Sequence, residues 1–144
     1  MTALDASVVV DWLITPVDAD TPAQRLRAEF ERTEEHLIAP RLLLEECLNA
    51  FLTGIRRRQW STAAADAAAR LLSALPVEIV DIGRDRERAW ELARRYDNHP
   101  LYDMVYVALA ERLGHRLVTA DRRLITRLGH LDWVVGPEEI LSGS

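Results

Sequence analysis

The chain has 144 residues, of which 49% are hydrophobic and 28% charged, with 6 glycines and 6 prolines. This balance is typical of a packed globular protein and excludes disordered, collagen-like and disulfide-rich classes, so we expect residues 1–144 to form a single domain. The formal net charge is -5, and its field would repel nucleic acid unless a metal ion, a local basic patch or a partner reverses it.

Cysteine and hydropathy patterns indicate where the protein works. The single cysteine, Cys47, cannot form an internal disulfide, and together with four histidines it matches no structural zinc pattern. No apolar run approaches the ~20 residues of a membrane-spanning helix, and the N-terminus lacks the basic start and apolar run of a secretory signal. We therefore expect a cytoplasmic protein that does not enter a membrane.

Short apolar runs rich in β-branched residues alternate along the chain with longer stretches of helical period. This alternation predicts an α/β fold in which a parallel sheet is covered by helices. The predicted strands are Thr2 to Leu4, His36 to Ala39, Val77 to Val80, Arg116 to Thr119 and Trp133 to Val135.

Six helices are predicted between these strands: Ser7 to Leu13, Ala23 to Arg32, Arg41 to Ile55, Ser61 to Ala74, Asp85 to Arg95 and Tyr102 to Leu113. Thr21, Ser61 and Asp85 are expected N-caps. Gly54 and the run Arg56 to Arg58 are expected to end the third helix, and Gly114 the sixth. The sixth is apolar nearly all round and should be the most buried.

Four acidic residues differ from the acids on solvated helix faces: Asp5, Glu46, Asp103 and Asp121. Asp5 and Asp121 each follow a predicted strand, and Asp103 opens the buried helix. In parallel sheets the carboxyl ends of the strands form the crevice where ligands bind. An Asp between a strand and a helix is, however, most often an N-cap, and each alone is weak evidence of a site.

Carboxylates that converge in a partly buried pocket repel one another unless protons or a hard cation supply positive charge. Mg²⁺ and Mn²⁺ prefer oxygen ligands and can activate water for phosphoryl displacement. The sequence therefore predicts the chemistry of a metal-dependent nuclease or phosphatase. A protein nucleophile is not indicated, because Cys47 lies on an apolar helix face and no serine sits in a G-x-S-x-G turn.

Four segments together resemble the PIN-domain ribonucleases of the VapC toxin type: Leu4 to Val10, Pro40 to Ala50, Tyr102 to Glu111 and Thr119 to Leu124. The resemblance covers nearly the whole chain. It implies a parallel sheet of about five strands between helices, an acidic pocket for Mg²⁺ or Mn²⁺, and endonucleolytic cleavage of RNA. It also implies a VapB-type antitoxin protein that blocks the site.

The resemblance assigns roles by position. Asp5, Asp103 and Asp121 would be metal ligands, and Glu46 would position the metal or its bound water. Ser7, Asn49 and Thr119 would support these ligands through hydrogen bonds, whereas Asp81 matches no catalytic position. Toxins of this type commonly pair as homodimers and bind antitoxin chains, and the exposed ends of the Arg41 to Ile55 and Ser61 to Ala74 helices are the expected interfaces.

Two arginine clusters could supply the local basic surface: Arg56 to Arg58, and Arg122, Arg123 and Arg127. Arginine near a helix C-terminus is also favoured by the helix dipole alone. We expect Arg122 and Arg123, beside the fourth acid, to bind substrate phosphates.

Three other functions remain open at this level. A phosphoacceptor receiver domain needs a lysine, but all 18 basic residues are arginine. A catalytically silent binding module would not need four intact carboxylates. A metal-free ribonuclease would use paired histidines, with His36, His99, His115 and His130 as the candidates. The four tryptophans are interpreted as core or interface anchors rather than base-stacking surfaces.

Overall fold

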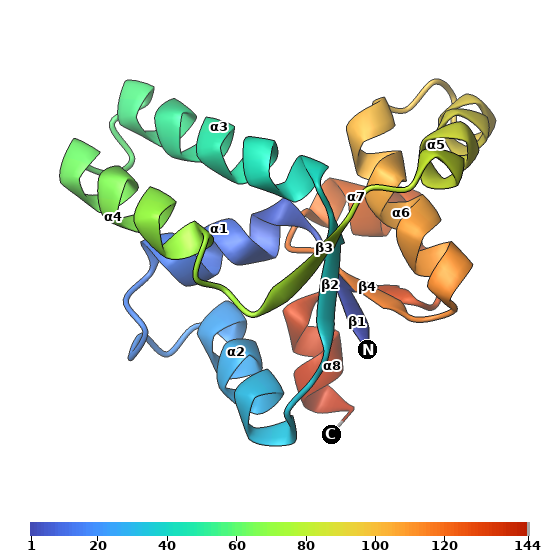
Figure 1. Ribbon diagram of the computed structural model, residues 1–144. Coiled ribbons are helices and arrows are strands. Elements are labelled where there is room, and N and C mark those ends of the chain that lie inside the picture. Colours follow the sequence, from blue (N-terminus) through green and yellow to red (C-terminus); the bar gives the residue numbers. More distant parts are fainter. Residues whose placement is uncertain (144) are drawn as a thin grey trace.

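A five-stranded parallel sheet forms the centre of the computed structural model, which describes residues 1–143 (Figure 1). The strand order is β3-β2-β1-β4-β5, and every pairing is parallel. The strands are β1 (Thr2–Leu4), β2 (Leu37–Pro40), β3 (Val77–Val80), β4 (Arg116–Val118) and β5 (Val134–Val135). The predicted α/β class is confirmed, and each strand lies within one residue of its predicted bounds.

Helices cover both faces of this sheet and complete three layers. They are α1 (Ala6–Ile14), α2 (Pro22–Thr33), α3 (Leu42–Arg56), α4 (Thr62–Leu72), α5 (Gly83–Arg95), α6 (Leu101–Leu113), α7 (Arg122–Arg127) and α8 (Pro137–Ser142). Helix α6 packs on β1, β2 and β4 with α5 outside it, whereas α1 to α4 pack together on the other side (Figure 1). The six predicted helices are present, and the short α7 and α8 are additional.

Several predicted helix ends are confirmed by hydrogen bonds. The hydroxyl oxygens of Thr21 and Ser61 accept from backbone N–H groups in the first turns of α2 and α4. Gly114 follows α6 with a φ of 68°, a left-handed conformation that glycine adopts without strain. Helix α6 is the apolar helix expected, and its buried residues include Met104, Tyr106 and Leu109.

Two predicted helix ends are wrong. Asp85 does not cap α5, because the helix begins at Gly83 and the buried Asp85 carboxylate accepts two hydrogen bonds from Arg112 at 2.6 and 2.9 Å. Gly54 does not end α3 but lies inside it, and the helix ends at Arg56, in the arginine run that was expected together with Gly54. A Cβ atom there would lie 2.0 Å from the Trp60 ring, so glycine is needed for close packing rather than for termination.

The parallel arrangement determines where the functional residues gather. Since all strands run the same way, the segments that follow β1, β2, β3 and β4 lie at one edge of the sheet. Asp5 follows β1 at this edge, and Asp121 lies three residues after the end of β4. Within residues 1–143, no helix has both the length and the apolar character needed to span a membrane.

Candidate active site

Asp5 is a buried carboxylate between β1 and α1, with only 6% of the residue exposed. It occupies the N-cap position of α1, but its side chain makes no capping hydrogen bond. Its Oδ2 atom instead accepts from the hydroxyls of Ser7, at 2.6 Å, and Thr119, at 2.8 Å. The Asp5 side chain therefore does not cap α1, and its Oδ2 atom binds hydroxyls of α1 and of the segment after β4 instead.

Hydroxyl groups tie the ends of β1 and β4 together around Asp5. Besides binding Asp5, Ser7 Oγ accepts from the backbone N–H of Ala120 at 2.9 Å, and Thr119 Oγ1 accepts from that of Asp121 at 3.0 Å. These bonds fix the spacing between the segments that carry Asp5 and Asp121. The hydrogen-bonding positions expected of Ser7 and Thr119 are thus present in the structure.

Glu46 lies on the first turns of α3 and reaches the buried helix α6. Its Oε1 atom accepts a 2.5 Å hydrogen bond from the hydroxyl of Tyr106, which is fully buried. Burial raises the pKa of Glu46, the charges of Asp5 and Asp103 raise it further, and the Tyr106 hydrogen bond opposes them. Burial also raises the pKa of Asp5 above its usual range, with a smaller contribution from Asp103. Asp5, Glu46 and Asp103 therefore share one electrostatic environment.

The apolar pattern of α6 did not indicate Tyr106 as a residue of the site. A signal was available, since Tyr106 lies three residues after Asp103 and the two therefore share one face of the helix. A buried tyrosine hydroxyl needs a hydrogen-bond partner, and a carboxylate at the site supplies it. Asn49, in contrast, is exposed on α3 and makes no side-chain hydrogen bond within residues 1–143, so its expected supporting role is not visible.

Asp103 lies in the first turn of α6 and contacts His99 from the preceding loop. The His99 Nε2 and Asp103 Oδ2 atoms are 2.7 Å apart, and only 9% of the histidine side chain is exposed. An ionised carboxylate only accepts, so Nε2 carries the hydrogen. The His99 Nδ1 atom is buried and has no partner in the described chain. His99 therefore makes its one side-chain hydrogen bond to a site carboxylate.

Asp121 combines two roles. Its Oδ1 atom caps α7 by accepting from the backbone N–H groups of Arg123, at 2.9 Å, and Leu124, at 3.4 Å. The capping interpretation considered from the sequence therefore holds for Asp121. Asp121 also lines a cavity of about 650 Å³ together with Asp103, His99 and Arg123. One cavity is thus lined by both Asp103 of α6 and Asp121, the N-cap residue of α7.

The donor chemistry of these carboxylates fits a hard divalent cation. All four supply oxygen ligands, which Mg²⁺ and Mn²⁺ prefer. For Glu46, Asp103 and Asp121, the second carboxylate oxygen makes no hydrogen bond within residues 1–143. In the conformations of the described side chains, no three His, Cys, Asp or Glu residues are grouped closely enough to hold an ion. Asp5, Asp103 and Asp121 would therefore have to move toward a bound cation.

The arginines predicted to bind substrate differ in their partners. Arg122 is held by α8 through Glu138, at 3.1 Å, and Glu139, at 3.3 Å. The Arg123 side chain lines the 650 Å³ cavity and makes no ion pair within residues 1–143. Arg56 to Arg58 lie at the other end of α3, roughly 15 Å along the helix from Glu46. Only the second arginine cluster therefore lies beside the carboxylates.

The structure does not support a protein nucleophile or a histidine pair. Burial raises the pKa of Cys47 to about 12, so the thiolate is not formed near neutral pH. His36 and His115 precede β2 and β4 and lie at the opposite edge of the sheet. His130 hydrogen-bonds the Tyr96 hydroxyl at 2.6 Å. The predicted histidines are thus not brought together, and His99 alone contacts a site carboxylate.

Comparison with known proteins identifies the family. The model of the PIN domain matches residues 2–131. The chain belongs to the PIN-domain family. Ribonuclease VapC12 of Mycobacterium tuberculosis is 31% identical to this PIN-domain chain over 130 residues, which cover 90% of this chain and 94% of the relative. Ribonuclease VapC3 of the same organism is 35% identical over 121 residues, 84% of this chain and 82% of the relative.

Solved structures share the PIN-domain fold. PAE2754 from Pyrobaculum aerophilum has a TM-score of 0.69 and 21% identity, covering 98% of this chain and 86% of that one. A toxin–antitoxin complex from Klebsiella pneumoniae has a TM-score of 0.65 and 18% identity, with coverage of 95% and 98%. The expected family, fold and resemblance to VapC ribonucleases are therefore confirmed.

Proposed function

We propose that this PIN-domain protein is the toxin of a toxin–antitoxin pair and acts as an endoribonuclease that depends on Mg²⁺ or Mn²⁺. The observation that carries the proposal is the environment shared by Asp5, Glu46 and Asp103, in which burial and like charge raise the pKa values of Asp5 and Glu46. Such repulsion is relieved by protons or by a bound cation, and the proposed reaction uses the cation. The named VapC ribonuclease relatives agree with this chemistry.

The protein's own residues have separate tasks in this reaction. Asp5, Asp103 and Asp121 would hold the cation, which when bound supplies a nucleophilic water and stabilises charge on the phosphate. Ser7 and Thr119 orient Asp5, and Tyr106 orients Glu46. His99 orients Asp103. Arg123 binds an RNA phosphate from the wall of the cavity.

A protein antitoxin is the proposed partner, and the apolar surface of α3 and α4 is its proposed docking site. Leu48, Leu52 and Leu71 are 42%, 56% and 52% exposed, and Ile79 of β3 is 37% exposed. Exposed apolar patches of this kind mark protein interfaces. Leu48 and Leu52 lie on α3, the helix that also carries Glu46, but residues two apart on a helix face different directions, so a partner seated here would contact the helix rather than the Glu46 side chain. We refer to these four residues as the leucine patch.

Cleavage of total cellular RNA tests the enzymatic proposal. The antitoxin-free protein is incubated with RNA in Mg²⁺ or Mn²⁺, alongside EDTA and an Asp103→Asn variant. We expect discrete fragments that disappear in both controls. Activity that survives EDTA would exclude the metal mechanism. A folded, metal-loaded protein that cuts nothing would favour the catalytically silent binding module.

A further inference from the structure

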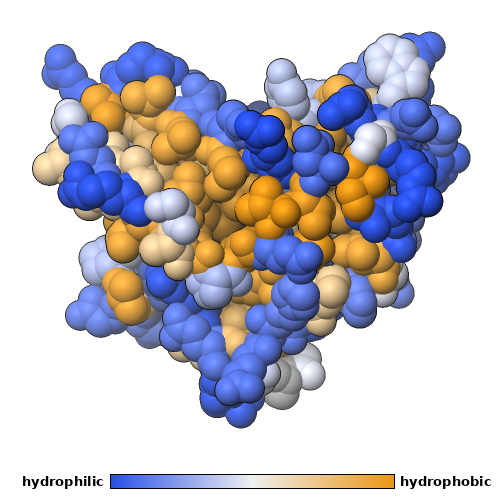
Figure 2. Space-filling model, viewed as in Figure 1, coloured by the Kyte–Doolittle hydropathy of each residue, from blue (hydrophilic) through white to orange (hydrophobic). Residues whose placement is uncertain are grey.

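A second cavity, of about 280 Å³, lies at the same edge of the sheet as the carboxylates but over β2 and β3. It is enclosed by the start of α3, the segment after β3 and the first turn of α6. Its wall combines apolar side chains, including Ile82, Leu101 and Val105, with the aromatic ring of Tyr102. Figure 2 shows this region as a notch with a hydrophobic floor between the α3–α4 side and the α5–α6 side. We name it the Tyr102 pocket.

Tyr102 is the exposed aromatic residue of this pocket. It is 60% exposed, and within residues 1–143 its ring stacks on no other ring and its hydroxyl makes no hydrogen bond. An exposed ring with no internal partner contributes little to folding. It does offer a flat apolar face, which is the surface on which single-stranded nucleic acids stack their bases.

The strand order arranges the Tyr102 pocket, the carboxylates and the arginine-lined cavity in a row. The pocket includes the residues after β2 and β3, Asp5 follows β1, and Asp121 follows β4. Adjacent strands are about 4.8 Å apart, so the row from β3 to β4 spans roughly 15 Å. Tyr102 and Asp103 are consecutive on α6 but line different cavities. An extended RNA strand bound along this edge would therefore contact the Tyr102 pocket, the carboxylates and the arginine-lined cavity.

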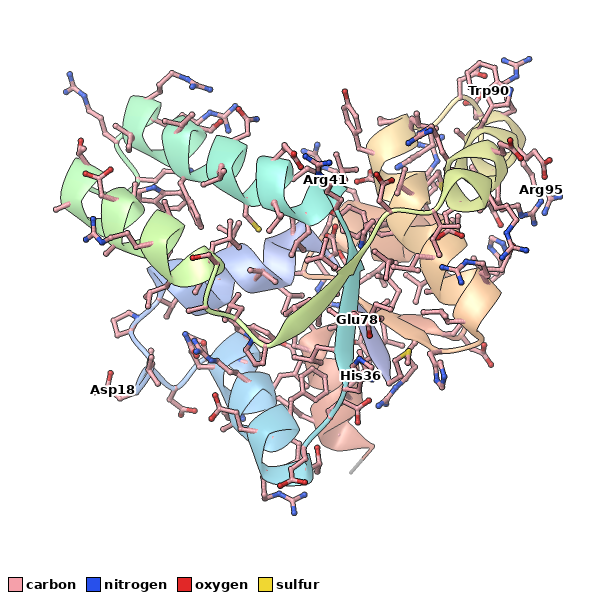
Figure 3. The ribbon with its side chains drawn as sticks, in the orientation of Figure 1. Asp18, His36, Arg41, Glu78, Trp90 and Arg95 are labelled. Atoms are coloured by element: carbon pink, nitrogen blue, oxygen red, sulfur yellow. The ribbon has the colours of Figure 1, made fainter. Side chains whose placement is uncertain are left out.

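Weakly held arginines flank the Tyr102 pocket. Arg41 lies 3.9 Å from Glu45, and Arg86 lies 3.7 Å from Asp81, with neither pair within hydrogen-bond distance. Both arginine side chains are about two-thirds exposed, and Figure 3 shows Arg41 at the start of α3 beside the notch. Exposed pairs of this kind contribute little energy, so the guanidinium groups can exchange these partners for phosphates.

We propose that the Tyr102 pocket binds one unpaired base of the RNA substrate, which stacks on the Tyr102 ring while Arg41 and Arg86 bind the adjoining phosphates. This inference rests on the proposed ribonuclease function and adds the kind of RNA that the site accepts. A base inside a duplex cannot enter such a pocket, so the substrate is single-stranded at this point. The pocket selects the nucleotide near the cleaved bond.

Binding of a short single-stranded RNA that carries 2-aminopurine tests the proposal, because stacking on an aromatic ring quenches this fluorescent base. All proteins carry Asp103→Asn so that bound RNA is not cut. We expect Tyr102→Leu to remove the quenching and to weaken binding about tenfold or more, whereas Tyr102→Phe retains both. Trp90→Leu is the matched control, because Trp90 is 64% exposed on α5 and Figure 3 shows it far from Arg41. Trp90→Leu should change neither the quenching nor the affinity for RNA.

Cleavage assays in proteins with Asp103 intact separate this inference from the proposed function. We expect Tyr102→Leu to cut total RNA with an altered set of fragment ends. If unmodified protein cuts nothing but quenches the fluorescent base through Tyr102, the ribonuclease proposal fails and the base pocket stands. If quenching and fragment ends are the same in Tyr102→Leu, the base pocket is wrong. If that variant loses affinity only for the antitoxin, the pocket is a protein-binding site and the base proposal is again overturned.

Discussion

His99 and Asp103 show how a loop residue controls a site carboxylate. The 2.7 Å contact uses Asp103 Oδ2, and Oδ1 makes no hydrogen bond within residues 1–143. The histidine is nearly buried, so its ring cannot easily turn away. Hydrogen bonds of this kind orient metal ligands, and their loss typically costs about 10- to 100-fold in metal affinity or activity. A histidine without a catalytic partner can therefore still affect catalysis strongly.

We predict that His99→Ala weakens Mn²⁺ binding about 10- to 100-fold, since Asp103 loses the donor that fixes its orientation. His99→Gln should restore part of this affinity because its amide can donate to the same oxygen. Titration with Mn²⁺, followed by the midpoint of thermal unfolding, measures the affinity without a cleavage assay. The His115→Ala variant, altered at the opposite edge of the sheet, serves as control. Equal Mn²⁺ affinities in His99→Ala and the unsubstituted protein would contradict the positioning role.

At the scale of elements, local patterns and long-range packing account for different parts of the fold. The β strands were predictable to within one residue because central parallel strands are short apolar runs. The two six-residue helices α7 and α8 were not, since fewer than two turns give no clear period. Asp85 looked like a cap because its partner Arg112 is 27 residues away, and Tyr106 looked like core because Glu46 is 60 away.

Gly54 of α3 provides a test of such packing. We predict that Gly54→Ala lowers the free energy of unfolding by about 1–3 kcal/mol, because the new Cβ would overlap the Trp60 ring. The matched control is Gly83→Ala in α5, where a Cβ meets nothing within 4 Å and helix propensity favours alanine. Urea unfolding of both variants measures the difference. A loss no greater for Gly54→Ala than for Gly83→Ala would show that Trp60 moves aside freely.

For the whole molecule, a net charge of -5 has to be reconciled with a polyanionic substrate. The structure does this locally around the 650 Å³ cavity, where Arg122, Arg123 and Arg127 lie beside Asp103 and Asp121, whereas acids and arginines together line the Tyr102 pocket. Arg112 is held by the buried carboxylate of Asp85, and Arg122 pairs with the exposed Glu138 and Glu139. Both Arg122 and Arg123 were predicted to bind substrate because they follow Asp121 in the sequence. The structure distinguishes them, since Arg122 pairs with Glu138 and Glu139 whereas Arg123 makes no ion pair within residues 1–143.

We predict that Arg123→Ala reduces the steepness of the plot of log affinity for RNA against log salt concentration by about one unit, as expected for one lost phosphate contact. Arg122→Ala, the adjacent control, should change this slope little because Glu138 and Glu139 already hold the Arg122 side chain. Binding of single-stranded RNA at several salt concentrations gives both slopes. Equal reductions in the two variants would show that Arg122 leaves its glutamates for the RNA.

The leucine patch concerns the assembly of the whole molecule. Leu48 and Leu52 lie one turn apart on α3, and Leu48 and Ile79 border a cavity of about 410 Å³ between α3, α4 and β3. Hydrophobic atoms cover much of this side of the molecule (Figure 2). The leucine patch contains none of the arginines proposed to bind RNA, so substitutions in it test antitoxin binding separately from substrate binding.

We predict that the double variant Leu48→Glu, Leu52→Glu binds the antitoxin about 30-fold more weakly or worse, since two charges would be desolvated at the centre of an apolar interface. Its ribonuclease activity should persist without inhibition by the antitoxin, because neither leucine contributes to the carboxylate site. Calorimetric titration with the antitoxin measures the affinity, and Trp90→Glu, an exposed apolar position on α5, is the control. If the double variant binds the antitoxin normally but light scattering shows that a dimer has become a monomer, a second copy of the chain covers the patch. The antitoxin would then have to reach the acidic site from another side, across the edge of the sheet that carries Tyr102 and Arg123.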